Sequence, residues 1–425
     1  MSSGGASVSA GGLLLAARNL RAALRAVGST RRVLAPVLVV ALGLGLTIGP
    51  RLAAYHGNPT GFVQFGRQFA HDTHPPAGAI VGSPIGYDGQ FIWIHARDPL
   101  ALHVSTRANL DAAGRGYDLQ RVAYPALAAL LAAGRTDVLP WTLLSVNVLA
   151  LLAITAAVAA YARTRGRSVW WGLAIGLTPG LVMGTLRDLG DPLAITAMLG
   201  GLIAYERGRR WPAAMLLTLA VLAREPMIVA VAAVAVEMLA GLWSARSASE
   251  TRRRVTRAWP VVVVPMIIFI GWQLYTRSLT LPAVPSSPVT HARAVAATRA
   301  PAGSDSLVLP PLSDFRTEIR RTMTIDTPSA AAWDLTYIAL VLAGMVAAVA
   351  ALRRGPWAST VTGVLTAAVL TVIFFGDQWG ISRYGAPLFG ALLLSGLRAG
   401  LRASPRLCAA AAALTLLIPF VVPGG

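Results

Sequence analysis

The residues best suited to chemistry lie in one short string, Ile-Gly-Tyr-Asp-Gly-Gln-Phe at 85–91. The carboxylate of Asp88 can take a proton from a sugar hydroxyl, and its neighbours Tyr87 and Gln90 are of the aromatic and amide types that contact sugars. Asp98 follows closely as a second carboxylate with a structural or binding role. The alternative is that Asp88 only forms a turn, because Asp-Gly favours tight turns.

A second set of charged residues lies at the ends of apolar runs. Charges so close to hydrocarbon are costly, which suggests a function. Arginine side chains can bind phosphate oxygens in a bidentate manner, so this set is suited to a phosphate and a polyol. For each pair the alternative is an interfacial salt bridge or a membrane anchor. The set comprises Arg187, Asp188, Asp191, Arg224, Glu225, Asp377 and Arg383.

Metal chemistry has weaker support in the sequence. His71-Asp72-Thr73-His74 could hold a divalent ion, although two histidines in a loop more often bind nothing specific. Cys408 is the single cysteine, which excludes an intrachain disulfide and a thiolate cluster. No cofactor is established, and a divalent ion that assists a leaving group stays open.

Composition places these residues in a membrane protein. The chain is 55% hydrophobic and only 13% charged, with a mean hydropathy of +0.61. The net charge of +19 could suggest nucleic acid. We exclude that function, because the arginines form short clusters between apolar runs, where they set topology instead.

Applied one crossing at a time, the positive-inside rule predicts an all-α integral membrane protein with about eleven transmembrane helices. Residues 1–32 form a cytoplasmic amphipathic segment, and 33–425 form the transmembrane domain. External loops span about 51–138, which bears interfacial helices, and 277–333. The predicted helices are about 33–50, 139–162, 168–186, 192–206, two within 211–243, 259–276, 334–352, 356–375, 384–398 and one at the C-terminus.

Two segments decide this threading. The run 211–243 is divided at Arg224-Glu225-Pro226, because a single helix would place Arg252–Arg254 outside. Pro226 is tolerated where it opens the second helix. The short run 121–134 is interpreted as interfacial or re-entrant, since a crossing there would invert everything that follows.

On this topology the polar residues have a strong sidedness. All six histidines lie outside, and so do the acidic residues except Glu206, Glu237 and Glu250. The alternative is a passive effect of membrane insertion. Combined with the charged helix ends, however, the pattern favours a reaction chamber on the outer face, beneath the loop that carries Asp88.

Several of these strings resemble one known family. Gly-Tyr-Asp-Gly-Gln-Phe at 86–91 resembles a motif of bacterial proteins related to the GT-C superfamily of polyprenyl-phosphate-sugar-dependent glycosyltransferases. Arg187 to Asp191, Leu222 to Pro226, and Gly385 to Phe389 after Arg383 are similar as well. The resemblance covers most of the chain from residue 33 onward and is moderately specific at superfamily level.

The resemblance implies a multi-helix core, amphipathic helices of the first loop on the membrane surface, and an aspartate of that loop as catalytic base. Asp88 takes that role here, with Asp72 and Asp98 as rivals, because Asp88 stands alone and farther from the first helix than is usual in the family. The implied donor is a lipid-phosphate sugar of mannose or arabinose type, and inversion is expected at the anomeric carbon.

The expected function is therefore transfer of a sugar from a polyprenyl-phosphate donor to a glycan, lipid or protein acceptor of the cell envelope. The expected location is the plasma membrane, with the N-terminus inside. A transporter or flippase is the chief alternative, and it should show helix breaks near mid-membrane and internal repeats. A non-catalytic subunit of envelope assembly is the third interpretation.

Overall fold

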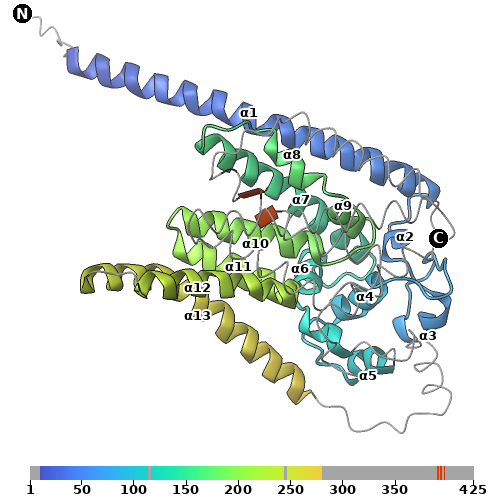
Figure 1. Cartoon of the computed structure of the whole chain (residues 1–425). Helices are drawn as coiled ribbons and strands as arrows, with labels where there is room; N and C mark the ends of the chain where they lie inside the picture. Colours follow the sequence, from blue (N-terminus) through green and yellow to red (C-terminus); the bar gives the residue numbers. More distant parts are fainter. Residues whose placement is uncertain are drawn as a thin grey trace, which may run out of the picture.

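The computed structural model describes residues 10–112, 116–243 and 247–279, together with positions 390, 391, 393, 394 and 397. Within these residues the chain is helical, with two isolated β-bridges and no strand. Figure 1 shows the long helices side by side and the short helices α2–α5 gathered at one end of the bundle. The expectation of an all-α protein is confirmed for this part of the chain.

Three helices of the described part are long and apolar enough to cross a membrane. They are Arg32–Ala54 in α1 (Ala10–Ala54), α7 (Leu139–Thr164), and Ala258–Ser278 in α13 (Ala248–Ser278). The 26 residues of α7 span about 39 Å at 1.5 Å per residue, more than the hydrocarbon core. These helices indicate a membrane protein. Helix α1 is continuous through residue 32, where the sequence suggested a boundary between two segments.

The expectation of one continuous helix over 168–186 is wrong. The chain forms α8 (Trp171–Gly176) and α9 (Pro179–Thr185), separated by Leu177 and Thr178. Thr178 is extended at ψ 129°, because a residue before proline avoids the helical region, and Pro179 then starts α9. Helix α8 also packs closely on α7, since a Cβ at Gly176 would lie 2.1 Å from Thr155 Oγ1.

The predicted division of 211–243 is confirmed. Helix α10 (Asp191–Glu206) is followed by α11 (Arg210–Ala223), the short η3 (Glu225–Met227) and α12 (Ile228–Trp243). Arg224 is extended at φ −152° and ψ 119°, which ends α11. Helix α10 packs along α11, and α11 packs against α13. The corner around Glu225 thus joins α11 to α12.

The first long loop folds into a compact cap. Its core consists of buried aromatic side chains, with Phe65 edge-on to Trp93 at 5.9 Å and Phe69 edge-on to Phe91 at 5.3 Å between ring centroids. The elements are α2 (Thr60–Val63), η1 (Arg67–Phe69), α3 (Ala70–Thr73), α4 (Gly89–Arg97), α5 (Val104–Ala112), η2 (Gly116–Gln120) and α6 (Ala123–Ala132). At about 15 Å, α6 is too short to cross a bilayer, which agrees with an interfacial or re-entrant segment.

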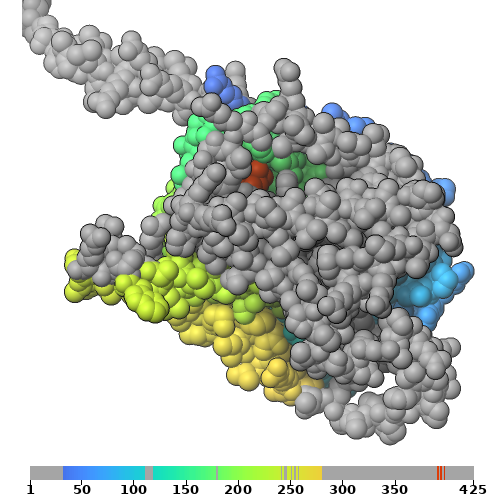
Figure 2. Space-filling model, in the orientation of Figure 1, coloured from blue at the N-terminus to red at the C-terminus, as the bar shows by residue number. Residues whose placement is uncertain are grey.

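Helix α13 fastens this cap to the bundle. Trp272 Nε1 donates to Leu119 O at 3.0 Å, and the Tyr275 hydroxyl donates to Leu100 O at 2.7 Å. On the same helix, Ile267 and Leu274 are 65% and 62% exposed. Figure 2 shows this helix in yellow at the surface of the molecule. The exposed apolar side chains are those of a helix that faces lipid.

The remaining predicted helices, 334–352, 356–375 and the last one, lie outside the described residues, as does the loop 277–333 beyond residue 279. Of the segment 384–398, positions 390, 391, 393, 394 and 397 are described and helical. A Cβ at Gly390 would lie 2.6 Å from a side-chain atom of Leu199. This segment therefore packs directly against α10.

Candidate functional site

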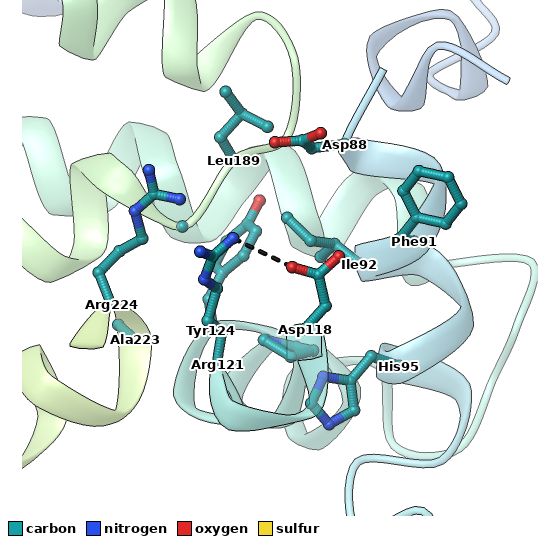
Figure 3. Close-up of a pocket in the computed structure, with 12 residues that line it drawn as sticks. Asp88, Phe91, Ile92, His95, Asp118, Arg121, Tyr124, Leu189, Ala223 and Arg224 are labelled. Atoms are coloured by element: carbon teal, nitrogen blue, oxygen red, sulfur yellow. Dashed lines mark hydrogen bonds and ion pairs between the residues drawn. The ribbon is translucent and has the colours of Figure 1, made fainter. Parts of the chain in front are cut away.

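A pocket lies where the cap meets the bundle, and Figure 3 shows its charged residues pointing toward one another from separate elements. Asp88 precedes α4, Asp118 belongs to η2, Arg121 precedes α6, and Arg224 follows α11. The empty space is about 400 Å³, including its open mouth. The remaining lining residues are Phe91, Ile92, His95, Tyr124, Pro125, Leu189, Gly190 and Ala223.

Two glycines explain why Asp88 reaches this pocket. Gly86 has φ +75°, and a Cβ there would lie 2.4 Å from Gly66 N. A Cβ at Gly89 would lie 2.7 Å from the carbonyl oxygens of both Val63 and Arg187. No side chain fits at either position. Gly86 therefore allows close approach to the segment at 64–66, Gly89 allows close approach to the turn between α9 and α10, and Asp88 lies between the two glycines.

Gln90 stabilises this loop and does not line the pocket. Its side chain is 1% exposed, with Oε1 accepting from Gly66 N at 3.0 Å and Nε2 donating to Ile85 O at 2.9 Å. The expected contact between Gln90 and substrate has no support in this geometry. The side-chain amide of Gln90 links two segments of irregular chain. This link requires a long side chain with both a donor and an acceptor.

Arg187 extends over the ring of Tyr87, with Cζ 4.3 Å from the ring centroid. Arg51, at the end of α1, lies within electrostatic range of Arg187. Two guanidinium groups brought near each other repel, and an anion between them would relieve the repulsion. Arg187 and Tyr87 therefore form, with Arg51, a cationic edge beside Asp88.

Arg121 is the centre of a three-residue ion-pair network. It donates to both carboxylate oxygens of Glu225, at 2.9 and 2.7 Å, and to Asp118 at 3.0 Å. Burial alone would raise the pKa of Glu225, but the hydrogen bonds from Arg121 lower it below its usual value. Figure 3 marks the contact between Arg121 and Asp118. This network joins the start of α6 to η3.

Arg224 and Asp191 form a second, more deeply buried pair. Arg224 Nη2 lies 3.0 Å from Asp191 Oδ1, and the two side chains are 6% and 4% exposed. Each pocket guanidinium thus already has a carboxylate of its own. The sequence suggested that Arg224, Glu225 and Asp191 bind phosphate and sugar, but here Arg224 pairs with Asp191 and Glu225 pairs with Arg121, so these pairs set the shape of the wall.

Asp188 does not line the pocket either. It is fully buried in the turn between α9 and α10 and has φ +49°, an unusual value for a residue with a side chain. Neither carboxylate oxygen has a hydrogen-bond partner among the described residues. Burial raises the pKa of Asp188 well above its usual value. A direct contact between Asp188 and substrate, expected from the sequence, therefore has no geometric support.

Asp98 holds the start of α5. Its two oxygens accept from Leu102 N at 3.1 Å and from His103 N at 2.8 Å. Burial would raise the pKa of Asp98, yet these hydrogen bonds lower it below its usual value. At 8% exposure and outside the pocket, Asp98 is a capping residue, so its expected substrate contact and its candidacy as base both lose support.

The remaining candidates lie elsewhere. Asp72 pairs with His71 at 3.4 Å, away from the pocket, which weakens it as a rival base. Within the described residues, His71 and His74 among them, no group of three or more His, Cys, Asp or Glu side chains could hold a metal ion. Asp377 and Arg383 lie outside the described residues.

Comparison of the chain with protein-family models, curated proteins and solved structures finds no match. The arrangement of the site is thus the basis for any functional proposal.

Sequence reasoning missed four pocket residues. Asp118 and Arg121 form the ion-pair network, while His95 and Tyr124 line the wall. Arg121 carried a usable signal, because it precedes an apolar run that is too short to cross the membrane. Like Arg187 and Arg224, it is an arginine at the end of an apolar run. The other three carried none, since only the fold of the cap brings them to the pocket.

Proposed function

We propose that this protein is a membrane glycosyltransferase that transfers a sugar from a polyprenyl-phosphate donor to a cell-envelope acceptor on the outer side of the plasma membrane. The observation that carries the proposal is the position of Asp88, in a pocket with two guanidinium groups at the junction of cap and bundle. The proposal includes about eleven transmembrane helices, an internal N-terminus, and a transmembrane domain that begins near residue 33 after the N-terminal segment.

In the proposed reaction Asp88 takes the proton of an acceptor hydroxyl, whose oxygen forms a bond to the anomeric carbon. The bond between that carbon and the donor phosphate oxygen breaks, and polyprenyl phosphate leaves with the electron pair. The configuration inverts because the attack is from the opposite face. No nucleotide is required, since the donor is already activated as a phosphate ester.

We assign the phosphate to Arg187 and Arg51, which form the cationic edge beside Asp88. Arg51 ends a candidate transmembrane helix, where the phosphate of a lipid donor would lie level with the interface. Tyr87, stacked on Arg187, then lies between the phosphate and Asp88 and contacts the sugar.

The test is an incorporation assay with membranes and radiolabelled polyprenyl-phosphate sugars. We expect Asp88→Asn to reduce transfer by a factor of about 10² or more, because the base contributes that much in comparable reactions. Asp137→Asn, an exposed carboxylate of the same loop region, is the matched control and should keep full activity. Retained transfer by Asp88→Asn would refute the assignment of the base.

A transporter is the second candidate, and one observation favours it. The break between α8 and α9 interrupts a segment that the sequence presented as a single membrane helix. Discontinuous helices of this kind often surround the substrate of a transporter. Two results together would favour this candidate. Vesicles that contain the protein would move a labelled lipid-linked sugar across the bilayer without transferring it to an acceptor, and wild-type membranes would show no sugar transfer with any donor.

A further inference from the structure

A cluster of buried oxygen atoms surrounds the turn between α9 and α10, apart from the charged pocket. Asn147 of α7 is fully buried, and both hydrogens of its Nδ2 are used, by the Tyr124 hydroxyl and by Leu189 O, each at 2.9 Å. The Tyr124 hydroxyl donates in turn to Leu143 O at 2.9 Å. The side-chain donors of this cluster are therefore all engaged.

Three acceptor oxygens remain. Asn147 Oδ1 and both carboxylate oxygens of Asp188 are buried and have no hydrogen-bond partner among the described residues. Asn147 and Asp188 lie in the same part of the fold, because Asn147 donates to the carbonyl of Leu189, the residue after Asp188, and Tyr124, its other partner, lies within electrostatic range of Asp188. Unpaired buried acceptors are rare in proteins, so a group of three requires a positive partner.

The turn itself is held in an unfavourable conformation. Asp188 is in the left-handed region at φ +49°, and two hydrogen bonds of the turn are long, at 3.4 Å from Arg187 N to Gly184 O and from Asp188 N to Thr185 O, although Leu189 N donates to Gly184 O at 2.9 Å. Such a backbone conformation costs about 1 kcal/mol or more and persists only where its surroundings impose it. Binding of a ligand by the Asp188 side chain would be such a constraint.

We propose that Asp188, Asn147 and the adjacent turn bind a sodium ion. Carboxylate, amide and carbonyl oxygens are the ligands that hard cations prefer. A single carboxylate matches a monovalent ion, whereas a divalent ion would leave an unbalanced charge in a buried site. A proton on Asp188 would serve at most one of the other acceptors, while a cation engages all of them together.

The site would be coupled to the charged pocket through the same turn. Leu189 and Gly190 line the pocket, and Arg187 extends over Tyr87 beside Asp88. A sodium ion that fixes Asp188 therefore also fixes the position of Arg187. This coupling holds whether the pocket performs sugar transfer or transport.

The experiment is a thermal unfolding series on the purified full chain in detergent at mildly alkaline pH. Sodium chloride, potassium chloride and choline chloride are compared at matched ionic strength. We expect sodium alone to raise the melting temperature, saturably, by about 2–4 °C. We expect Asp188→Asn to abolish that shift and Asp137→Asn, the matched exposed carboxylate, to retain it. Equal melting temperatures in all three salts, or a sodium shift that persists in Asp188→Asn, would overturn the proposal.

A second measurement keeps the test decisive if Asp188→Asn does not fold. Binding of ²²Na⁺ to the wild-type protein should be displaced by unlabelled sodium but not by choline. Asn147→Ser, which shortens one ligand without adding charge, should weaken that binding by about tenfold or more. Absence of displaceable ²²Na⁺ from the wild type would refute the site directly.

Discussion

At the residue scale, most residues of the string at 85–91 hold the loop in place, and the carboxylate of Asp88 is its one candidate for chemistry. Gly86 and Gly89 permit close approach of backbones, and Gln90 crosslinks the loop through both of its polar atoms. Asp88 and Phe91 line the pocket at the junction with the bundle, and Tyr87 lies beside it under Arg187. The sequence suggested Tyr87, Asp88 and Gln90 as residues that act on a sugar, but the side chain of Gln90 is used within the loop.

Substitution of Gly89 should therefore damage the fold as well as any activity. In Gly89→Ala the new Cβ would lie 2.7 Å from two carbonyl oxygens, whose backbone cannot yield easily. We expect a loss of about 1–3 kcal/mol in the free energy of unfolding. Gly82→Ala is the matched control, because nothing lies within 4 Å of its added Cβ. Thermal unfolding of the two variants checks the difference, and equal stabilities would contradict the close approach.

His95 should make the protein sensitive to acid. Burial lowers its pKa from 6.5 to about 4, while its ring nitrogen Nε2 lies 3.0 Å from Pro99 O. The unfolded chain binds a proton near pH 6.5 and the folded chain only near pH 4, so stability falls as pH decreases between these values. The loss should be about 3 kcal/mol over that interval.

The measurement is the free energy of unfolding from pH 7 down to 4 for the wild type and for His95→Gln, which keeps an N–H donor for Pro99 O. The free energy of unfolding of His95→Gln should change less with pH over this interval than that of the wild type. Asp98 does not confuse the result, because a carboxyl with a lowered pKa destabilises the fold only at more acidic pH. Parallel curves for the two proteins would show that His95 is not responsible.

At the element scale, the corner between α11 and α12 is the feature that the sequence predicted best. The charge bias of the flanking arginines and the Glu225-Pro226 pair located it without any structure. The break between α8 and α9 was missed, although Pro179 lies at it, because an uninterrupted apolar run outweighed one proline. The partner of Glu225 was also missed, since a sequence separation of 104 residues from Arg121 leaves no local pattern.

The pair of Arg121 and Glu225 should couple α6 to this corner energetically. A double-mutant cycle with Arg121→Gln and Glu225→Gln should give a coupling of about 1–3 kcal/mol, because both side chains are mostly buried. The exposed pair of Arg135 and Asp137, 68% exposed on both sides, is the matched control and should show no measurable coupling. Chemical unfolding of the wild type and the six variants provides both cycles, and equal couplings would contradict the structural difference.

At the scale of the whole molecule, composition and charge clustering predicted a helical membrane protein, and the described part of the chain agrees. Sequence could not predict that the first long loop has an aromatic core of its own, because its apolar residues follow no regular period. Nor could it predict which charged helix ends meet. Which ends meet depends on packing between α10, α11 and the cap. The sequence around a charged helix end does not indicate which other charged residue lies next to it in the fold.

The sidedness of the bundle is testable with reporter fusions. A reporter at Arg165, just after α7, and one at Arg209, just before α11, should be active in the cytoplasm. A reporter at Gly78 in the cap should be active on the outer side of the membrane. The physical reason is retention of arginine-rich loops in the cytoplasm. An exported signal at Arg165 or Arg209 would place the charged pocket on the inner side and refute a donor from the outer leaflet.

The two carbonyl oxygens that leave no room for a side chain at Gly89 also affect how mutational surveys of this protein must be interpreted. A scan of the string at 86–90 would find inactive variants at nearly every position, and the run would look like a catalytic signature. Only substitutions of Asp88 and Tyr87 would leave the amount of folded protein unchanged. Protein yield, measured beside activity, would separate the residues that hold the loop from those that act on a substrate.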